Sequence, residues 1–177
     1  MSKSSYAILG LLSKYSYSGY ELKRRIIKTS SFYCSESSAQ IYPVLKKLEV
    51  QELLTSNIDK ASGARNKRIY AITKKGRDEL IKWLKTDSDV AIYREEFLIQ
   101  LSLSQHLTTS QLSKKISHYQ QSIQEKLEIL TQVIKHIKKD HAGKEDQQYL
   151  LLTYDHIHAM LDAKLQWCIK ILKNLNK

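Results

Sequence analysis

The stretch SESSAQIYPVLKKLEV, residues 35–50, places Pro43, the only proline of the chain, inside a pattern that is otherwise typical of a helix. Its segment SSAQ, residues 37–40, fits a capping box, in which an N-cap hydroxyl and a Gln or Glu three residues later bind each other's backbone N–H groups. The stretch therefore predicts a helix over residues 38–54. At 100° per residue, Ile41, Leu45 and Leu48 share one face, which we expect to pack on the core of a domain.

The opposite face of this predicted helix is small, polar or basic, and Pro43 lies on it. An internal proline removes a backbone donor at a cost of about 3 kcal/mol, but on an exposed face the freed carbonyl of Ala39 can bind water. The alternative is a helix that begins at Tyr42 with Pro43 at position N1, where proline is favoured. Such an outward face suits the major groove of DNA, because the first residues of a recognition helix contact bases and lysines reach phosphate. The candidate DNA contacts on it are Ser37, Ser38, Gln40, Tyr42, Lys46 and Lys47.

Helix and strand signals on both sides of this stretch predict a winged helix-turn-helix. The segments SGYE, residues 18–21, and TTSQ, residues 108–111, also fit capping boxes. Helices are expected over residues 5–14 and 19–28. Two β-compatible runs, 54–58 and 68–72, flank a polar turn that contains Gly63 and predict a hairpin. Thr73 then caps a helix over 74–85. Three helices followed by a hairpin and a further helix are the order of a winged helix.

Composition and charge distribution favour a helical protein whose first half meets a polyanion. The 177 residues include 5 Gly and 1 Pro and are 42% hydrophobic, so a mainly α-helical chain with a packed core is expected. The formal net charge is +11. Residues 1–85 hold 17 Lys+Arg against 7 Asp+Glu, whereas residues 86–177 hold 12 against 11. Nucleic acid is the expected partner, and a basic face that serves only solubility is the alternative.

The second half shows two long apolar stripes at helical spacing. The first is Ile116, Tyr119, Ile123, Leu127, Leu130, Ile134 and Ile137, and the second, after a break at residues 140–143, is Leu150, Tyr154, Ile157, Leu161, Leu165, Cys168, Leu172 and Leu175. Such stripes are typical of coiled-coil seams. Two helices alone are not expected to cover both seams, so a homodimer is predicted, and an intramolecular hairpin packed on the first domain is the alternative. The predicted domains are a DNA-binding domain, 1–85, a linker, 86–93, and an antiparallel helical dimerisation domain, 94–177.

Other classes of function have little support in the sequence. No phosphate-cradling glycine loop, Gly-x-Ser-x-Gly elbow or His-Glu-x-x-His is present, so an enzyme is not expected. Asp155, His158 and Asp162 share a helix face and are possible metal ligands, but a polar stripe on a dimerisation helix is the favoured interpretation, and no cofactor or metal is predicted. No apolar run approaches the about 20 residues of a membrane span. Cys34 and Cys168 lack paired or metal-ligand spacing, which suits a reducing cytosol and a cytoplasmic protein.

Several blocks of the chain, taken together, resemble the PadR family of bacterial transcriptional regulators. They are ILGLL (8–12), SGYELKRRI (18–26), QIYPVLKKLE (40–49) and IYAITKKGRDEL (69–80). The second half, with REEFLIQLSLSQHL (94–107) and Trp167, is similar to the C-terminal helical domain of the longer members. The resemblance implies a homodimer that binds a pseudo-palindromic operator, usually as a repressor, and that small phenolic or other aromatic molecules release in several members.

The resemblance also directs attention to the wing and to the aromatic residues. The wing residues Arg65, Lys67 and Arg68 are expected to touch the DNA backbone or the minor groove. The family commonly has Gly where this chain has Glu52, and its wing often reads Gly-Arg-Pro where this chain has Gly-Ala-Arg (63–65). A helical interaction or small-molecule-binding dimer without specific DNA binding is therefore kept as the alternative function. An effector pocket between the two domains is predicted from aromatic side chains that offer flat contact area, with core packing of each as the alternative: Trp83, Tyr93, Phe97, Tyr154 and Trp167.

Overall fold

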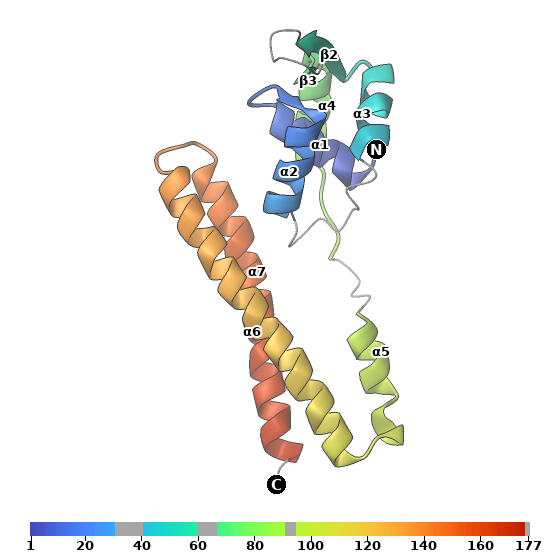
Figure 1. Ribbon diagram of the computed structural model, residues 1–177, viewed down its shortest axis with the longest axis vertical. Helices are drawn as coiled ribbons and strands as arrows, with labels where there is room; N and C mark the ends of the chain where they lie inside the picture. Colours follow the sequence, from blue (N-terminus) through green and yellow to red (C-terminus); the bar gives the residue numbers. More distant parts are fainter. Residues whose placement is uncertain (31–40, 60–66, 91–94, 176–177) are drawn as a thin grey trace. The chain divides into compact units, whose positions relative to one another are not determined.

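A computed structural model describes residues 1–30, 41–59, 67–90 and 95–175 of the chain. The chain divides into two compact units, residues 1–90 and residues 91–177, here called the N-terminal unit and the C-terminal unit (Figure 1). The predicted linker, 86–93, spans this division, and part of it lies outside the described residues.

The N-terminal unit begins with two capped helices. Helix α1, Lys3–Leu12, starts two residues before the predicted position because the side chain of Ser2 is its N-cap and accepts a hydrogen bond from the Ser5 backbone N–H. Helix α2, Gly19–Ser30, opens on the predicted capping box. Ser18 Oγ accepts from the Glu21 backbone N–H at 3.3 Å, and Glu21 Oε2 accepts from the Ser18 backbone N–H at 2.8 Å. This capping box is confirmed.

Helix α3, Ile41–Val50, confirms the predicted inner face. Ile41, Leu45 and Leu48 are buried in the core of the unit. The capping box predicted at residues 37–40 lies outside the described residues.

The predicted end of this helix at residue 54 is wrong, because the chain turns directly after Val50. The Leu53 N–H binds the Leu48 carbonyl at 2.9 Å, and the Glu52 N–H binds the Glu49 carbonyl at 2.9 Å. These two bonds form a Schellman motif, which requires a left-handed residue at the position of Glu52. Glu52 has φ 60° and is the only non-glycine residue with positive φ in the described part of the chain.

A three-stranded antiparallel sheet follows, with the strand order β1-β3-β2. Strands β2, Leu54–Asp59, and β3, Lys67–Ile72, confirm the predicted hairpin strands, whereas the turn around Gly63 lies outside the described residues. Strand β1, Tyr17–Ser18, is too short for its sequence to reveal it, and it pairs Tyr17 with Tyr70 of β3.

Helix α4, Lys74–Leu84, completes the N-terminal unit and is capped by Thr73 as predicted. Its Gly76 lies directly against the turn after α3, since a Cβ added there would stand 2.2 Å from the Leu53 carbonyl oxygen. The core between these elements is apolar: Ile8, Leu9, Leu12, Leu22, Ile26, Ile41, Leu45, Leu48, Leu53, Leu54, Tyr70 and Leu80.

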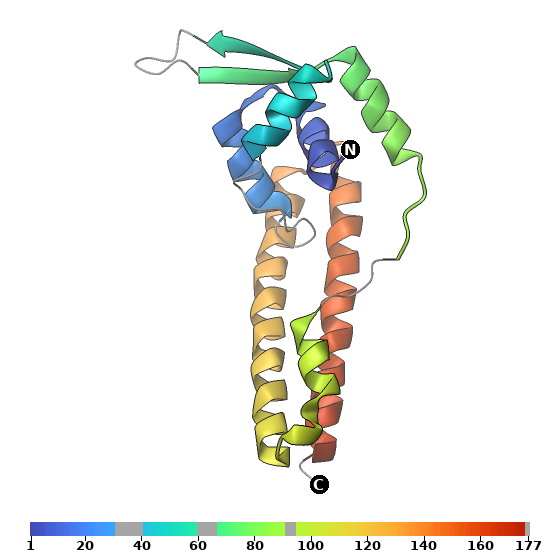
Figure 2. The ribbon, with the colours of Figure 1, turned by 90° about the vertical axis from the view of Figure 1, so that its right-hand side faces the viewer.

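The C-terminal unit is entirely helical within its described residues. A short helix α5, Glu96–Ser102, and a 3-10 turn η2, Ser104–His106, precede two long helices, α6, Thr109–Asp140, and α7, Gln147–Leu175. The capping box at Thr108 and Gln111 that opens α6 is confirmed. Helices α6 and α7 pack side by side as an antiparallel hairpin (Figure 2).

The two apolar stripes lie on the facing sides of this hairpin, where every stripe residue is buried or half-buried. Each stripe covers the other only in part within one chain, because most stripe residues stay half-buried, as expected if two helices alone do not cover both seams. Large apolar side chains nevertheless remain exposed elsewhere on the unit: Leu98, Ile99, Leu103, Leu107, Ile129, Tyr149, Leu152 and Ile169. These side chains, together with the half-buried stripe residues, are the apolar surface left for a partner.

Candidate nucleic-acid interface

The side of α3 that faces away from the core carries Tyr42, Pro43, Lys46, Lys47 and Val50, all of them exposed. This set is called the outer face of α3. It contains two cations and no acid, and both lysines lack a described acidic partner in the part of the chain that the structure covers. The outer face therefore presents positive charge and a phenol to any molecule that approaches α3.

Tyr42 is held in place by the first residue of α2. A Cβ added at Gly19 would stand 2.6 Å from the Tyr42 Cε1 atom, so the phenol ring covers the bare backbone at this position. Tyr42 as a whole remains 53% exposed. Gly19 and Tyr42 thus let the start of α2 pack closely against α3.

Pro43 is the third residue of the described helix and is exposed. The acceptor that the missing N–H of Pro43 would use in a helix lies four residues earlier, outside the described residues. Within the described part of α3, Pro43 therefore removes no hydrogen bond, and its exposed position leaves the core residues undisturbed.

Arg68 of strand β3 is bound to helix α3. Its Nη2 atom donates to Glu49 Oε1 at 2.9 Å and to Glu49 Oε2 at 3.0 Å, while its Nε atom donates to Ser56 Oγ at 2.6 Å. Ser56 in turn donates to Glu49 Oε1 at 2.5 Å. This cluster of Glu49, Ser56 and Arg68, here called the wing clamp, joins β2 and β3 to α3 and neutralises the one acid of the described helix.

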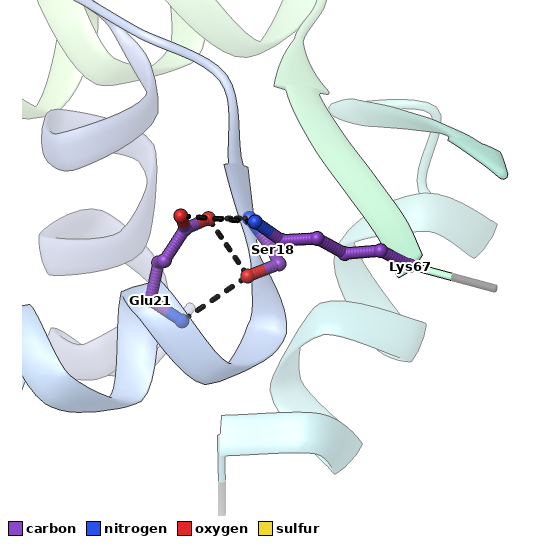
Figure 3. Close-up of polar contacts among 3 residues, drawn as sticks. All are labelled: Ser18, Glu21 and Lys67. Atoms are coloured by element: carbon purple, nitrogen blue, oxygen red, sulfur yellow. Dashed lines mark hydrogen bonds and ion pairs between the residues drawn. The ribbon is translucent and has the colours of Figure 1, made fainter. Parts of the chain in front are cut away.

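Lys67 is bound to the other helix of the helix-turn-helix. Its Nζ atom lies 3.0 Å from Glu21 Oε1, while Glu21 Oε2 accepts hydrogen bonds from the Ser18 backbone N–H and hydroxyl (Figure 3). The hydrogen bonds from Ser18 and then that from Lys67 lower the pKa of Glu21 from 4.5 to about 2. One carboxylate therefore both caps α2 and ties β3 to it.

The structure thus separates the predicted DNA contacts into groups. Tyr42, Lys46 and Lys47 lie together on the outer face of α3. Lys67 and Arg68 lie beside it on β3, and each is paired with a carboxylate that no sequence pattern links to it. The remaining candidates, Ser37, Ser38, Gln40 and Arg65, lie outside the described residues.

The aromatic residues predicted as an effector pocket are only partly brought together. In the C-terminal unit the Phe97 ring stacks on Tyr119, with centroids 3.8 Å apart and planes at 4°, and meets the Trp167 ring edge-on at 6.1 Å. Tyr154 is buried 13 residues before Trp167 on α7. At 1.5 Å per residue the two are about 20 Å apart, too far to line one small pocket. In the N-terminal unit Trp83 stacks on Tyr6 at 4.3 Å. Tyr93 lies outside the described residues.

A polar group borders this aromatic cluster. Tyr119 Oη donates to Glu95 Oε2 at 3.2 Å, and Lys164 Nζ forms an ion pair with Glu95 Oε1. Burial, together with the adjacent Glu95 carboxylate, raises the pKa of Tyr119, so its hydroxyl remains a donor. Burial alone would lower the pKa of Lys164, but the hydrogen bond to Glu95 raises it overall and keeps the ammonium charged. The sequence pattern places Tyr119 only in the apolar stripe and carries no signal for Glu95 or Lys164.

The alternative metal stripe and a membrane span have no structural counterpart among the described residues. Asp155 and His158 are exposed, and Asp162 is half-buried. No group of three His, Cys, Asp or Glu side chains in the described ranges is arranged to hold a metal ion. None of the described helices combines the length and the apolar character that crossing a bilayer requires.

Two family models match the chain in succession. Residues 8–82 match the Transcriptional regulator PadR-like family, and residues 93–176 match Virulence activator alpha C-term. The Negative transcriptional regulator PadR of Bacillus subtilis (strain 168) is 30% identical over 123 residues, which make up 69% of this chain and 68% of the relative. The chain therefore belongs to the PadR family of transcriptional regulators.

Solved structures share the fold along almost the whole chain. The crystal structure of Bacillus subtilis PadR in complex with operator DNA has a TM-score of 0.85 and 24% identity and covers 97% of this chain and 98% of that one. The structure of the same protein in complex with p-coumaric acid has a TM-score of 0.81 and 23% identity and covers 98% and 95%. The predicted fold class, a winged helix-turn-helix followed by an antiparallel helical domain, is confirmed.

Proposed function

We propose that this regulator acts as a repressor, binding a pseudo-palindromic operator as a homodimer with the outer face of α3 in the major groove. The observation that carries the proposal is the outer face itself. Lys46 and Lys47 have no described acidic partner there, while Glu49, the acid on the same helix, is neutralised by Arg68. Phosphate contacts from lysines supply affinity without sequence preference.

Sequence discrimination is assigned to the residues that precede the described part of α3. Gln40 offers a bidentate amide for an adenine edge, and Ser37 and Ser38 offer hydroxyls. Lys67 and Arg68 act mainly by fixing the wing to α2 and α3, and Arg65 is the remaining candidate for the minor groove. The operator complex of the Bacillus subtilis relative, which shares the fold, supports this use of the winged helix.

The dimer is assigned to the C-terminal unit. Within one chain α6 and α7 cover each other's stripes only in part, so the half-buried stripe residues and the exposed apolar side chains of α5, α6 and α7 are the surface that a second copy would bury. Two copies of α3 then lie about 34 Å apart, one turn of DNA. The p-coumaric acid complex of the relative supports release by a small aromatic acid.

Footprinting on the DNA upstream of the coding region tests the proposal. We expect protection of two half-sites about 10 base pairs apart, a stoichiometry of two chains per operator, and higher expression of a reporter when the regulator is absent. Protection of a single half-site by one chain would contradict the dimer. No protection upstream or at neighbouring promoters would favour the alternative of a helical interaction protein.

A further inference from the structure

The only acidic residues of α2 and α3 both bind strand β3. Glu21 is the one acid in the sequence of α2, and Glu49 is the one acid in that of α3. Lys67 Nζ lies 3.0 Å from Glu21 Oε1, and Arg68 Nη2 lies 2.9 Å from Glu49 Oε1 (Figure 3 shows the first pair). Two neighbouring cations of β3, here called the β3 cations, are therefore each neutralised by a carboxylate from a different helix.

Neither ion pair follows from local spacing along the chain. Oppositely charged side chains three or four residues apart are neighbours on a helix, and Lys46 precedes Glu49 by three residues. Glu49 nevertheless binds Arg68, 19 residues further along, and Glu21 binds Lys67, 46 residues further along. The fold therefore places the negative charge of both helices on the β3 cations and leaves Lys46 on the outer face of α3 without it.

The β3 cations are exposed enough to reach a phosphate once their carboxylates are removed. The side chain of Arg68 is 57% exposed, and that of Lys67 is 40% exposed. A cation that contacts a phosphate releases counterions from the DNA, which adds affinity on any sequence and steepens the salt dependence. A carboxylate that already holds the cation competes with the phosphate and also repels it. The two ion pairs therefore reduce what the β3 cations contribute to the binding of any DNA.

Cations with and without carboxylate partners have different consequences for the choice of DNA. Lys46 and Lys47 on the outer face of α3 can contact phosphate without giving up an ion pair in the described part of the chain. Binding to unrelated DNA is almost entirely electrostatic, so neutralising the β3 cations weakens it. Specificity is a difference of two affinities and is raised by weakening the binding of wrong partners. The same bonds fix β3 against α2 and α3, and this preorganisation favours a single well-defined complex with the operator.

We propose that Glu21 and Glu49 are specificity-determining residues, which limit binding to DNA without the operator sequence by neutralising the β3 cations. The proposal rests on the operator binding proposed above and deepens it. Neither carboxylate has to touch a base, because each acts through the cation that it holds. Without the carboxylates, unrelated DNA gains two phosphate contacts per chain. The operator gains the same contacts but loses the fixed position of β3, so the ratio of the two affinities falls.

Fluorescence anisotropy of the full-length protein tests the proposal with two probes, a duplex spanning the footprinted operator and a scrambled duplex of the same length and base composition. We expect Glu21→Gln/Glu49→Gln to bind the scrambled duplex about fivefold more tightly, with a slope of log K against log salt steeper by up to about 1.8 per bound chain. Operator affinity should stay within about twofold of that of the unmodified protein.

The matched control is Glu52→Gln/Asp78→Asn, which removes two charges from exposed ion pairs with lysines elsewhere in the N-terminal unit. It should leave both affinities unchanged. Adding Lys67→Ala and Arg68→Ala to Glu21→Gln/Glu49→Gln should return the affinity and the salt slope for the scrambled duplex to those of the unmodified protein.

Binding of the scrambled duplex that is unchanged, or that rises equally in the control, would overturn the proposal. So would a loss of operator affinity without a gain on the scrambled duplex, because that is the result of a purely structural role. Circular dichroism melting checks folding, and if the double variant does not fold, the single variants decide through slope changes of about 0.9 each. An unmodified protein that does not prefer the operator would contradict the proposed function, whereas an operator-binding protein whose variants gain nothing contradicts this inference alone.

Discussion

Replacing Arg68 by Ala separates two roles for the wing cation. If Arg68 contacts phosphate, its loss removes one DNA contact. In the wing clamp, Arg68 instead neutralises Glu49, which lies on the recognition helix about 20° around the axis from Tyr42. Arg68→Ala then leaves a negative charge on the side of α3 that is proposed to face DNA. The structure predicts that the second effect dominates.

The magnitude follows from the exposure of the pair. Arg68 has 57% and Glu49 21% of its side chain exposed, so the clamp contributes about 1 kcal/mol to the free energy of unfolding, as a well-formed but largely exposed ion pair does. An unpaired carboxylate about 10 Å from a phosphate costs about 0.4 kcal/mol in water and about 1.7 at an effective dielectric constant of 20. We therefore expect Arg68→Ala to weaken DNA binding about two- to twentyfold.

Fluorescence anisotropy with operator DNA over a series of salt concentrations distinguishes the two roles. Adding Glu49→Gln to Arg68→Ala should restore most of the affinity and leave the salt slope unchanged. The control is Glu52→Gln, which removes the same charge from an exposed side chain that is paired with Lys75. Adding it to Arg68→Ala should not restore the affinity. A salt slope that falls by about 0.9 in Arg68→Ala and is not restored by Glu49→Gln would refute the clamp and favour a phosphate contact.

Three further perturbations follow from the geometry of the N-terminal unit. Glu52→Gly should raise the free energy of unfolding by about 0.5–1 kcal/mol, because Glu52 holds a left-handed conformation that only Gly adopts without strain; urea denaturation that shows no gain would contradict this. Glu21→Gln should cost about 1 kcal/mol at pH 7, since hydrogen bonds from Ser18 and then from Lys67 lower the pKa of Glu21, while its 40% exposed side chain keeps the benefit below that of the full shift. Because the folded pKa is lowered, this cost should disappear as the pH falls from 4.5 to about 2, and a pH-independent difference would count against it. Gly19→Ala should displace the Tyr42 ring and weaken operator binding by about fivefold or more with little loss of helix content, as anisotropy and circular dichroism would show.

The sequence predicts well those features that depend on local spacing. The inner face of α3, the capping boxes at Ser18 and Thr108, and the strands of the hairpin follow from periodicity and cap chemistry over a few residues. The end of α3 could not be predicted from the sequence. A Schellman turn is usually recognised by a Gly at the left-handed position, and this chain has Glu52 there. The two-residue strand β1 carries too few residues for any pattern.

The site was less predictable, because its ion pairs join residues far apart in the chain. Lys67 and Glu21 are separated by 46 residues, and Lys164 and Glu95 by 69. Basic residues on a wing suggested DNA contacts, but only the fold shows that Lys67 and Arg68 already have carboxylate partners. Likewise the aromatic residues near the domain junction were grouped by composition, whereas helix geometry sets Tyr154 about 20 Å from Trp167.

The salt dependence of operator binding by Lys46→Ala/Lys47→Ala tests most directly that the outer face of α3 holds DNA. Lys138→Ala/Lys139→Ala, which removes an exposed lysine pair from the last turn of α6, is the matched control. We predict that the α3 variant lowers the slope of log K against log salt by about 1.8 per bound chain, and that the control keeps the slope of the unmodified protein. Equal slopes for the two variants would contradict the assignment of α3 as the DNA-binding helix.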